Sequence, residues 1–329
     1  MAQLAHERLV RMVVTRALPE ALSDRITREW NAWTNPEDRT LSTPELIAAA
    51  NAHQAEVLLV MALDRIDAAL ITSLPASVRM IASLSVGHEH IDLAAARTRG
   101  IAVVHTPGIH SDAVSEIAIL LMLCAARRAH EGERTIYDQT WRGWSPTQLL
   151  GRDVIGARLG VLGMGRIGRT IARRASAAFD MGVHYHNRSR LPADLEAGAT
   201  YHDTADALLG ESDFLVLAAP SSSETRGFLN AQRIARLPRG AIVVNIARGD
   251  LVDDAALIAA LESGQIAAAG LDVFNGEPDI DPRYRSLPNV FLQPHQGSST
   301  IGTRVRMGQL LLDTIATVSA GGTAPNRLV

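Results

Sequence analysis

The sequence predicts an α/β protein with parallel sheets in two domains, and three observations support this prediction. The chain has 329 residues, which is more than one ordinary core can organise. Short runs of β-branched residues alternate with longer alanine-rich stretches, as they do in βαβ units. These runs form two series, one before residue 105 and one after residue 157, with a long apolar stretch and a tryptophan-containing segment between them.

The composition is that of an ordinary globular protein. Apolar residues make up 47% and charged residues 20% of the chain, and the net charge of -3 gives no basic surface for nucleic acid or anionic lipid. The longest apolar run, Ile117 to Ala126, is about half as long as a membrane helix. The first 16 residues include charged side chains and lack the apolar core of a signal peptide, so we expect a cytoplasmic protein. The single cysteine, Cys124, excludes an intramolecular disulfide and is expected to pack as a small apolar residue.

The first series of runs predicts the strands and helices of one domain. The predicted strands are Leu9–Val14, Val57–Val60, Met80–Ser85 and Ile101–Val104. Between them, Thr43–His53 and Asp67–Leu74 have the pattern of helices. Strands that alternate with helices in this way are typical of a parallel sheet.

A long helix and an irregular segment separate the two series. The helix is expected after residue 108, with Ser111 or Asp112 as its cap and the apolar run buried on most faces. The irregular segment, residues 138–146, contains Trp141 and Trp144 beside glycine and proline. From the residues alone we expect these tryptophans to pack at a domain or subunit boundary, in preference to direct contact with a substrate.

The second series contains six strands with helical connections, which is the number and spacing of a dinucleotide-binding sheet. The strands are predicted at Arg158–Leu162, Gly182–His186, Phe214–Leu217, Ala241–Ile246, Ala268–Val273 and Asn289–Leu292. A final helix, Ile301–Ser319, has no strand after it.

A glycine motif follows the first strand of the second series and opens a helix over residues 166–177. It reads Gly163-Met-Gly165-Arg-Ile-Gly168. Gly163 permits a tight turn, Gly165 lets the backbone approach a pyrophosphate, and Gly168 lets the helix pack closely on the strand. The N-terminus of the helix would face the phosphates with its unpaired N–H groups. In this context the motif predicts a dinucleotide site rather than a glycine-rich turn without function.

The end of the next strand indicates which dinucleotide binds. An NAD enzyme usually has an aspartate or glutamate there, which bonds the 2′-hydroxyl of the ribose. This chain has Asn187-Arg188-Ser189-Arg190 instead, and two arginines, an amide and a hydroxyl can hold a 2′-phosphate. We therefore expect NADP as the cofactor, with NADPH preferred over NADH. The alternative is that the arginines lie on a solvated turn.

Three side chains near predicted strand ends could reduce a 2-keto acid, which needs a cation for its carboxylate and a proton donor for its carbonyl oxygen. Arg248 follows the strand that ends at residue 246, and its guanidinium can grip a carboxylate. Glu277 and His295 each follow a later strand at the same edge of the sheet. A carboxylate beside the imidazole would fix its tautomer and favour its protonated form, so that His295 donates the proton. Asp272 either faces the nicotinamide carboxamide or only terminates its strand.

The remaining polar clusters have simpler interpretations. Asp250 and Asp253 have the positions of helix-start residues. The triplet His88-Glu-His90 is the nearest to a metal-binding pattern, but it directly precedes a helix start at Asp92. We therefore expect no metal, and the sequence contains no nucleophile elbow or Walker loop.

Several of these motifs together resemble the D-2-hydroxyacid dehydrogenase family, and in particular its glyoxylate/hydroxypyruvate reductase branch. The resemblance extends over nearly the whole chain, and its last three motifs are the most distinctive. It is carried by Ser83–Gly87 with His90–Asp92, Thr106–Gly108, Trp141–Leu150, Leu162–Gly168, Asn245–Asp250, Leu271–Pro278 and Pro294–Thr300.

The resemblance implies a two-lobed enzyme with a discontinuous substrate domain. Residues 1–107 and 299–329 would form the substrate domain, and residues 108–298 would form an inserted NAD(P)-binding domain of the Rossmann type. The lobes would close over the substrate and exclude water before hydride transfer. Members are usually homodimers, in which a segment like that of Trp141 reaches the active site of the neighbouring subunit. Trp141 is therefore also a candidate substrate contact.

The resemblance also assigns roles to individual positions. Arg248 would bind the substrate carboxylate together with the backbone of Val86 and Gly87, while Glu277 and His295 would transfer the proton. The positions expected to contact the cofactor are Gly163, Gly165, Arg166, Ile167, Gly168, Asn187, Arg188, Ser189, Pro220, Ile246, Asp272 and Gly297.

The activity that the resemblance implies is NADPH-dependent reduction of glyoxylate to glycolate and of hydroxypyruvate to D-glycerate. A reductase of sugar keto acids such as 2-ketogluconate is the close alternative, and a nucleotide-sensing corepressor is an alternative of another class. Two departures from the family's pattern bear on the choice of substrate. Gln296 stands where most relatives have an apolar residue, and Met61-Ala-Leu63 replaces a more polar stretch. Both departures leave the reaction type unchanged.

Overall fold

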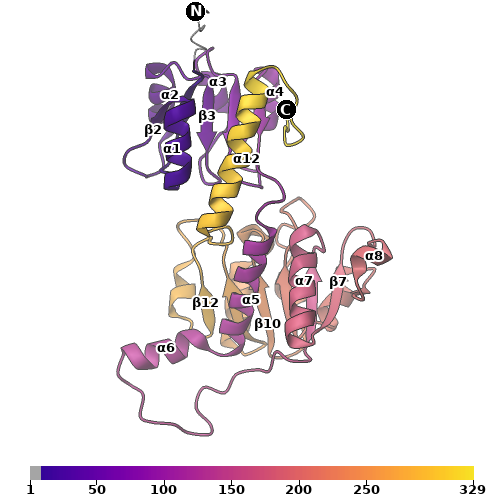
Figure 1. Ribbon diagram of the computed structural model, residues 1–329. Coiled ribbons are helices and arrows are strands. Elements are labelled where there is room, and N and C mark those ends of the chain that lie inside the picture. Colours follow the sequence, from indigo (N-terminus) through magenta and orange to yellow (C-terminus); the bar gives the residue numbers. More distant parts are fainter. Residues whose placement is uncertain (1–8) are drawn as a thin grey trace, which may run out of the picture. The chain divides into compact units, whose positions relative to one another are not determined.

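The computed structural model describes residues 9–329, which form two compact units (Figure 1). Of the described residues, those from 9 to His110 form one unit together with Ser299–Val329, and Ser111–Ser298 form the other. The chain thus leaves the first unit once and returns to it once. The chain passes between the units at residues 110–111 and 298–299, close to the boundaries expected after residues 107 and 298. The assignment of one unit to the substrate and the other to NAD(P) stays a prediction.

The sheet of the first unit has five parallel strands in the order β2-β1-β3-β4-β5. They are β1 (Arg11–Val14), β2 (Asn31–Thr34), β3 (Val57–Val60), β4 (Met80–Ser83) and β5 (Ala102–Val104). The helices of this unit are α1 (Glu20–Glu29), α2 (Thr43–Ala52), α3 (Ala68–Ser73), α4 (Leu93–Thr98) and α12 (Ile301–Ser319). The strand order reverses beside β1, as in a doubly wound sheet.

Alternate side chains of a strand point to opposite faces of the sheet, and helices cover the apolar side chains on both faces. Met12 and Val14 of β1 belong to one buried cluster with Leu22 of α1 and Leu311 of α12. Val13 belongs to a second cluster, with side chains of α2, α3 and α4. The last helix of the chain, drawn in yellow in Figure 1, is therefore part of the core of the first unit.

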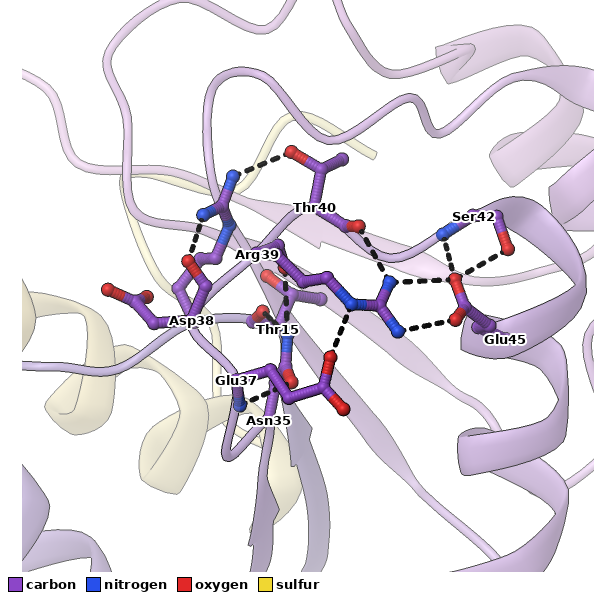
Figure 2. Close-up of polar contacts among 9 residues, drawn as sticks. Thr15, Asn35, Glu37, Asp38, Arg39, Thr40, Ser42 and Glu45 are labelled. Carbon is purple, nitrogen blue, oxygen red and sulfur yellow. Dashed lines mark hydrogen bonds and ion pairs between the residues drawn. The ribbon is translucent and has the colours of Figure 1, made fainter.

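Polar side chains order the loop between β2 and α2 (Figure 2). The amide of Asn35 donates to the carbonyl oxygens of Thr15 and Arg39, at 3.1 and 2.8 Å. The guanidinium of Arg39 donates to Glu37 at 2.5 Å and to both carboxylate oxygens of Glu45, at 2.6 and 3.1 Å. Glu45 also takes part in the capping box at the start of α2. This network fixes a loop at the carboxyl edge of the sheet.

The sheet of the second unit has seven parallel strands in the order β12-β11-β10-β9-β6-β7-β8. They are β6 (Arg158–Leu162), β7 (Gly182–His186), β8 (Thr200–Tyr201), β9 (Phe214–Leu217), β10 (Ala241–Asn245), β11 (Ile266–Leu271) and β12 (Val290–Leu292). The helices are α5 (Ser111–Ala126), α6 (Ala129–Tyr137), α7 (Arg166–Phe179), α8 (Ala193–Glu196), α9 (Ala205–Gly210), α10 (Ala231–Ile234) and α11 (Asp254–Glu262), with short 3₁₀ helices at Gly249–Leu251 and Pro282–Ser286. The strand order reverses between β6 and β9, the switch point at which Rossmann sheets bind their ligands.

Two buried clusters cover the two faces of this larger sheet. Leu121 of α5 and Ile171 of α7 pack with Val161 of β6 on one face. Leu257 of α11 packs with Leu215 of β9 on the other, together with side chains of α9 and α10. Burial on both faces explains why these strands are continuous apolar runs in the sequence. The predicted class, two parallel-sheet α/β domains, is therefore confirmed.

Two edge strands, β2 and β8, were not predicted from the sequence. β2 reads Asn-Ala-Trp-Thr, and its side chains are exposed or half-buried, so it lacks the apolar run of a central strand. β8 contains only two residues. All ten predicted strands are present, with ends that differ from the prediction by up to two residues.

None of the helices among residues 9–329 is long and apolar enough to cross a membrane. Cys124 on α5 is half-buried, and burial raises the pKa of its thiol, with a smaller contribution from the charge of Glu133. The charged N-terminal stretch lies partly outside the described residues. The expected cytoplasmic location stays a prediction.

Candidate active site

The candidate active site of the second unit lies at the carboxyl ends of β10, β11 and β12. β11 stands between the other two strands, and all three are parallel. Arg248 follows β10, Glu277 follows β11 and His295 follows β12. Side chains that are far apart in the sequence therefore come to one edge of the sheet, where open α/β sheets bind their ligands.

His295 and Glu277 form a hydrogen-bonded pair. Nδ1 of His295 lies 2.7 Å from Oε2 of Glu277, and Oε1 of Glu277 accepts the backbone N–H of Phe274 at 2.8 Å. Because an ionised carboxylate only accepts, Nδ1 carries the proton in this pair and Nε2 is the ring nitrogen for a further partner. The side chain of Glu277 is 15% exposed and that of His295 is 36% exposed. The two side chains that the sequence predicted to lie together are thus in contact, with the imidazole more accessible than the carboxylate.

The surroundings of Glu277 keep its carboxyl ionised. Burial acts to raise its pKa, but the hydrogen bond and charge of His295, the N–H of Phe274 and the charge of Arg248 act in the opposite direction. The pKa of Glu277 consequently lies below its ordinary value of 4.5. An ionised carboxylate beside an imidazole fixes its tautomer and orients its free nitrogen toward a ligand.

Asp272 holds the loop that carries His295. Its carboxylate accepts the backbone N–H groups of Gln296 and Gly297 at 2.6 and 2.8 Å, and its carbonyl oxygen accepts the N–H of His295 at 2.8 Å. His295 has a φ of 54°, in the left-handed region, and these bonds hold the backbone there. Asp272 is 1% exposed, and burial raises its pKa. The structure thus gives Asp272 a positioning contact that the sequence did not predict, and its contact with nicotinamide stays a prediction.

The turn that carries Arg248 is fixed from both sides. The buried amide of Asn245 accepts a backbone N–H of this turn at 3.0 Å and donates to the carbonyl oxygen of Arg248 at 2.9 Å. On the other side, a Cβ at Gly249 would stand 1.8 Å from the carbonyl carbon of Phe274, so only glycine allows this approach. Phe274 lies in the loop after β11 that carries Glu277. The close contact therefore places the Arg248 turn directly beside the Glu277 loop.

Asp250 lies in the first turn of the 3₁₀ helix Gly249–Leu251, in keeping with the predicted helix-start position, but its carboxylate has partners that the sequence did not show. Its carboxylate accepts the hydroxyl of Ser221 at 2.5 Å and the Nε–H of Arg226 at 3.2 Å. Asp253 does cap α11, as predicted. Asp250 differs because it lies in a 3₁₀ turn, where its carboxylate reaches the loop after β9. It thereby ties the loop that contains Pro220 to the turn after β10.

The glycine motif lies between β6 and α7, and the space at Gly165 is open, because a Cβ there would meet no atom within 4 Å. Gly163 has a φ of 96°, and a Cβ there would stand 2.5 Å from the backbone nitrogen of Ala219. A Cβ at Gly168 would stand 2.3 Å from the carbonyl oxygen of Gly163. α7 begins at Arg166 with no side-chain cap from Gly165, so its first N–H groups can bind an anion. The residues present therefore fit a dinucleotide.

The other positions expected to contact the cofactor lie at the ends of neighbouring strands. Asn187 follows β7, and its Oδ1 accepts the backbone N–H of Met164 within the glycine motif at 2.7 Å. Arg188 and Ser189 are exposed on the same turn. Ile167 lies in the first turn of α7, Pro220 follows β9, Ile246 follows β10 and Gly297 follows β12.

The contacts of Arg190 differ from those expected if both arginines of this turn held a 2′-phosphate. Its Nε and Nη2 donate to the carboxylate of Glu196, at 2.9 and 3.0 Å. Of the two guanidinium groups, only that of Arg188 has no ion pair among the residues that the structure describes. The sequence could not show this pair, because Glu196 is recognised as a partner only in the fold.

Val86 and Gly87 belong to the first unit, in the loop after β4. The hydroxyl of Ser85 donates to the carbonyl oxygen of Gly87 at 2.6 Å, and Nδ1 of His105 donates to the carbonyl oxygen of Val86 at 2.9 Å. Ser85 is also bonded to the buried hydroxyl of Ser83 at 2.7 Å. These contacts fix the shape of the loop that the sequence assigned to the substrate carboxylate.

The triplet His88-Glu-His90 packs within the same loop. Nε2 of His90 lies 3.0 Å from the hydroxyl of Ser83, and the ring of His88 packs edge-on against His105 with centroids 6.1 Å apart. Over residues 9–329, no three His, Cys, Asp or Glu side chains are placed to hold a metal ion.

Three further candidates are exposed. Trp141 lies between α6 and β6 with 54% of its surface exposed, and Leu63 in the first unit is 49% exposed. Gln296 is also exposed, directly after His295.

Two supporting residues were missed in the sequence. Asn245 is a polar residue at the end of an apolar run, and this signal could have identified it as a turn-fixing residue. Glu196 stands in a stretch without a distinctive pattern, so no signal in the sequence identifies it.

Comparison with known proteins identifies the family. The family model described as "D-isomer specific 2-hydroxyacid dehydrogenase, NAD binding domain" matches residues 119–297, more than half of the chain. The chain belongs to this family. The family predicted from the sequence is thereby confirmed, and the protein is a dehydrogenase of this class with a nicotinamide dinucleotide cofactor.

Curated relatives place this dehydrogenase in the glyoxylate/hydroxypyruvate reductase branch. It is 41% identical over 313 residues to the glycerate dehydrogenase of Hyphomicrobium methylovorum, a match that covers 94% of this chain and 96% of the relative. It is 38% identical over 320 residues to the glyoxylate reductase of Thermococcus kodakarensis, covering 96% and 95%.

Solved structures share the fold of this dehydrogenase. A protein from Polaromonas sp. JS6 66, described as a D-isomer specific 2-hydroxyacid dehydrogenase, matches with a TM-score of 0.93 and 49% identity over 98% of this chain and 100% of that chain. The NADPH-dependent glyoxylate/hydroxypyruvate reductase of Sinorhizobium meliloti, solved in complex with NADP and malonate, matches with a TM-score of 0.85 and 29% identity over 97% of each chain.

Proposed function

We propose that this dehydrogenase uses NADPH to reduce glyoxylate to glycolate and hydroxypyruvate to D-glycerate. The observation that carries the proposal is the pair of His295 and Glu277, in which an ionised carboxylate orients an accessible imidazole beside the turn of Arg248. The names of the two curated relatives support the substrate class.

The reaction adds a hydride to the carbonyl carbon of the keto acid and a proton to its oxygen. The bound nicotinamide supplies the hydride. Arg248 grips the substrate carboxylate with paired N–H groups and places the carbonyl carbon for attack. His295 donates the proton from Nε2 to the carbonyl oxygen, while Glu277 stabilises the imidazolium until transfer. In the reverse direction His295 accepts the proton of the hydroxyl group.

The backbone N–H groups of Val86 and Gly87 complete the binding of the carboxylate in this proposal. Ser85 and His105 bind the carbonyl oxygens of the same loop, so they hold its peptide groups in one orientation. The first unit would thus contribute to substrate binding, and the second would hold the cofactor and transfer the proton.

The preference for NADPH rests on the turn after β7. Asn187, Arg188 and Ser189 stand where an NAD-specific enzyme usually has a carboxylate. A carboxylate would repel a 2′-phosphate, whereas an exposed guanidinium and a hydroxyl can bond it. The NADP in the Sinorhizobium structure supports this cofactor for the branch.

A homodimer is part of the proposal. The stretch from α6 to β6 exposes several large apolar side chains, and clusters of this kind mark protein interfaces. They are Ile136, Tyr137, Trp144, Leu150 and Ile155, with exposures of 58%, 77%, 83%, 65% and 72%. Trp141 on the same stretch would reach the substrate site of the partner.

A sugar keto acid such as 2-ketogluconate is the second candidate substrate. The observation that favours it is Gln296, whose exposed side chain stands next to His295 and offers an amide where an apolar residue is usual in the family. An amide can bond the extra hydroxyl groups of a longer substrate.

The test is a panel of keto acids followed by nicotinamide absorbance. Glyoxylate, hydroxypyruvate, pyruvate and 2-ketogluconate are each supplied with NADPH or NADH. We expect the highest kcat/KM with glyoxylate or hydroxypyruvate, and a value about tenfold or more higher with NADPH than with NADH. A maximum with 2-ketogluconate would favour the second candidate, and the absence of turnover with every acid would reject the proposed function.

A further inference from the structure

The turn after β7 is fixed at its far end by a cluster of three side chains, of which Tyr185 and Glu196 are buried and Arg190 is exposed. The hydroxyl of Tyr185 donates to Oε1 of Glu196 at 2.5 Å and accepts the backbone N–H of Leu191 at 3.0 Å. Arg190 donates to both oxygens of the same carboxylate, at 2.9 and 3.0 Å. Tyr185 is on β7 and Glu196 ends α8, so the cluster ties the turn to the elements on either side of it (Figure 1).

The burial of Glu196 makes its ion pair with Arg190 costly to break. Its side chain is 9% exposed, whereas that of Arg190 is 66% exposed. The hydrogen bonds from Arg190 and then Tyr185 hold the pKa of Glu196 below its usual range, against the effect of burial. A buried carboxylate that loses its cation is left without compensation for its lost hydration. Glu196 therefore favours the state in which Arg190 stays bound to it.

The near end of the turn is fixed to the phosphate-binding loop. Oδ1 of Asn187 accepts the N–H of Met164 at 2.7 Å, and the hydroxyl of Tyr201 donates to the carbonyl oxygen of Asn187 at 3.4 Å. Between the two fixed ends, Arg188 and Ser189 are exposed. The position of Arg188 relative to the glycine motif is thus set by contacts on both sides of it.

We propose that Tyr185, Arg190 and Glu196 are positioning residues for cofactor selection, and that Arg188 alone supplies the guanidinium that contacts the 2′-phosphate. This inference rests on the proposed preference for NADPH. The competing arrangement is that Arg190 leaves Glu196 and binds the phosphate as a second guanidinium. The two arrangements predict effects of opposite sign when Glu196 is removed.

The experiment measures the Kd of NADPH and of NADH for the full-length protein by fluorescence titration. Arg188→Ala should weaken NADPH binding about tenfold or more and leave NADH within about twofold, because one charge-assisted contact is lost. Glu196→Ala should weaken NADPH binding several-fold, because the turn loses its anchor. If Arg190 were a phosphate ligand, Glu196→Ala would release it and tighten NADPH binding.

A double variant keeps the test decisive if Glu196→Ala does not fold. Arg190→Gln with Glu196→Gln retains a hydrogen-bonded neutral pair and an acceptor for Tyr185, but has no guanidinium at position 190. We expect this variant to bind NADPH within about threefold of the unmodified protein. The NADH affinity and the unfolding midpoint report on the integrity of the fold.

The outcomes separate the inference from the proposed function. Tighter NADPH binding in Glu196→Ala, or a loss in the double variant as large as that of Arg188→Ala, would overturn the positioning role alone. An unmodified protein that binds NADPH no more tightly than NADH would remove the cofactor proposal, and this inference with it.

Discussion

In the proposed mechanism, proton transfer depends on the contact between Nδ1 of His295 and Oε2 of Glu277, which are 2.7 Å apart. The contact sets which ring nitrogen carries the proton and keeps a negative charge beside the ring. Asp272 holds the backbone of His295 in a left-handed conformation that places the ring against Glu277. A substitution of Glu277 that removes the charge but keeps the size of the side chain and a hydrogen-bond acceptor separates the effect of the charge from that of the hydrogen bond.

Glu277→Gln should lower kcat for keto-acid reduction by about 100-fold, because the amide removes the negative charge beside the proton-donating ring. The pKa of Glu277 lies below its ordinary value of 4.5, so its carboxyl is ionised throughout the neutral range and the loss should persist across that range. Steady-state rates over a neutral pH series measure the loss, and the Kd of NADPH is the control. Equal rates of the two proteins would contradict the role of the charge.

At the residue scale, the sequence located the candidate catalytic side chains better than the residues that hold them in place. Arg248, Glu277 and His295 follow strand ends and are residue types with matching chemistry, so their position and type made them candidates. The bonds from Asp272 to the His295 loop depend on backbone geometry that no sequence pattern specifies. The same holds for Glu196.

The loops after β10 and β11 approach each other closely at the backbone of Gly249 and Phe274. A methyl group added at position 249 tests this contact. Gly249→Ala should lower the free energy of unfolding by about 2 kcal/mol, because the new Cβ overlaps backbone that must then move. It should lower kcat/KM for the keto acid more than the affinity for NADPH, because the displaced turn carries Arg248. Urea unfolding and steady-state kinetics provide the two measurements.

Gly182→Ala is the matched control for this substitution. A Cβ at Gly182 would meet no atom within 4 Å, so its unfolding free energy should change by no more than about 0.5 kcal/mol. If Gly249→Ala changes the free energy of unfolding and kcat/KM no more than Gly182→Ala does, the close approach of the two loops is contradicted.

Asp213 ties the start of β6 to the start of β9. It accepts the backbone N–H and Nε–H of Arg158 at 3.0 Å each and the Nη2–H at 2.9 Å. The bonds from Arg158 hold the pKa of Asp213 below its ordinary value of 3.8, although burial acts in the opposite direction. A carboxyl whose pKa is lowered by folding stabilises the native state above its ordinary pKa. This contribution is lost as the pH falls through the pKa of the folded state.

Asp213→Asn should therefore lower the free energy of unfolding by about 1 kcal/mol at neutral pH, a value reduced by the partial exposure of Arg158. The difference from the unmodified protein should shrink as the pH falls below 3.8. Urea unfolding over a pH series measures it. Asp24→Asn, at an exposed position with no hydrogen bond among the described residues, should show no such trend. A difference that is constant with pH would contradict the role of the Asp213 charge.

At the element scale, the central strands could be predicted, but two of the edge strands, β2 and β8, could not. β3, β9 and β10 are buried on both faces, and this burial produces the apolar runs that identify them. β2 and β8 pair on one side only and are exposed or half-buried, so the same signal is missing. Their existence follows from pairing with β1 and β7, which is a property of the sheet.

At the scale of the whole molecule, the stretch from α6 to β6 tests the proposed homodimer. Trp144→Glu with Ile155→Glu places charges on side chains that are 83% and 72% exposed, so the fold of the unit should tolerate them. Sedimentation equilibrium should give a dimer for the unmodified protein and a shift toward monomer for the variant, because buried charges oppose association. Ile301→Glu, which changes an equally exposed side chain on α12, is the control. A monomeric unmodified protein would contradict the proposal.

The discontinuous division of the chain could not be derived from local patterns. The last helix has an ordinary amphipathic sequence, and only the fold shows that Met307 and Leu311 belong to the same buried cluster as β1. The discontinuous domain was predicted only because the sequence resembles a known family. The two parallel sheets themselves follow from the alternation of runs along the chain.

The central claim, that His295 supplies the proton for reduction of a 2-keto acid, is tested most directly by NADPH oxidation in His295→Ala with glyoxylate. We predict a loss of kcat of about 1,000-fold or more with the Kd of NADPH essentially unchanged, because the ring is removed from the reacting atoms while the glycine motif is untouched. A variant that turns over glyoxylate at the rate of the unmodified protein would contradict the account.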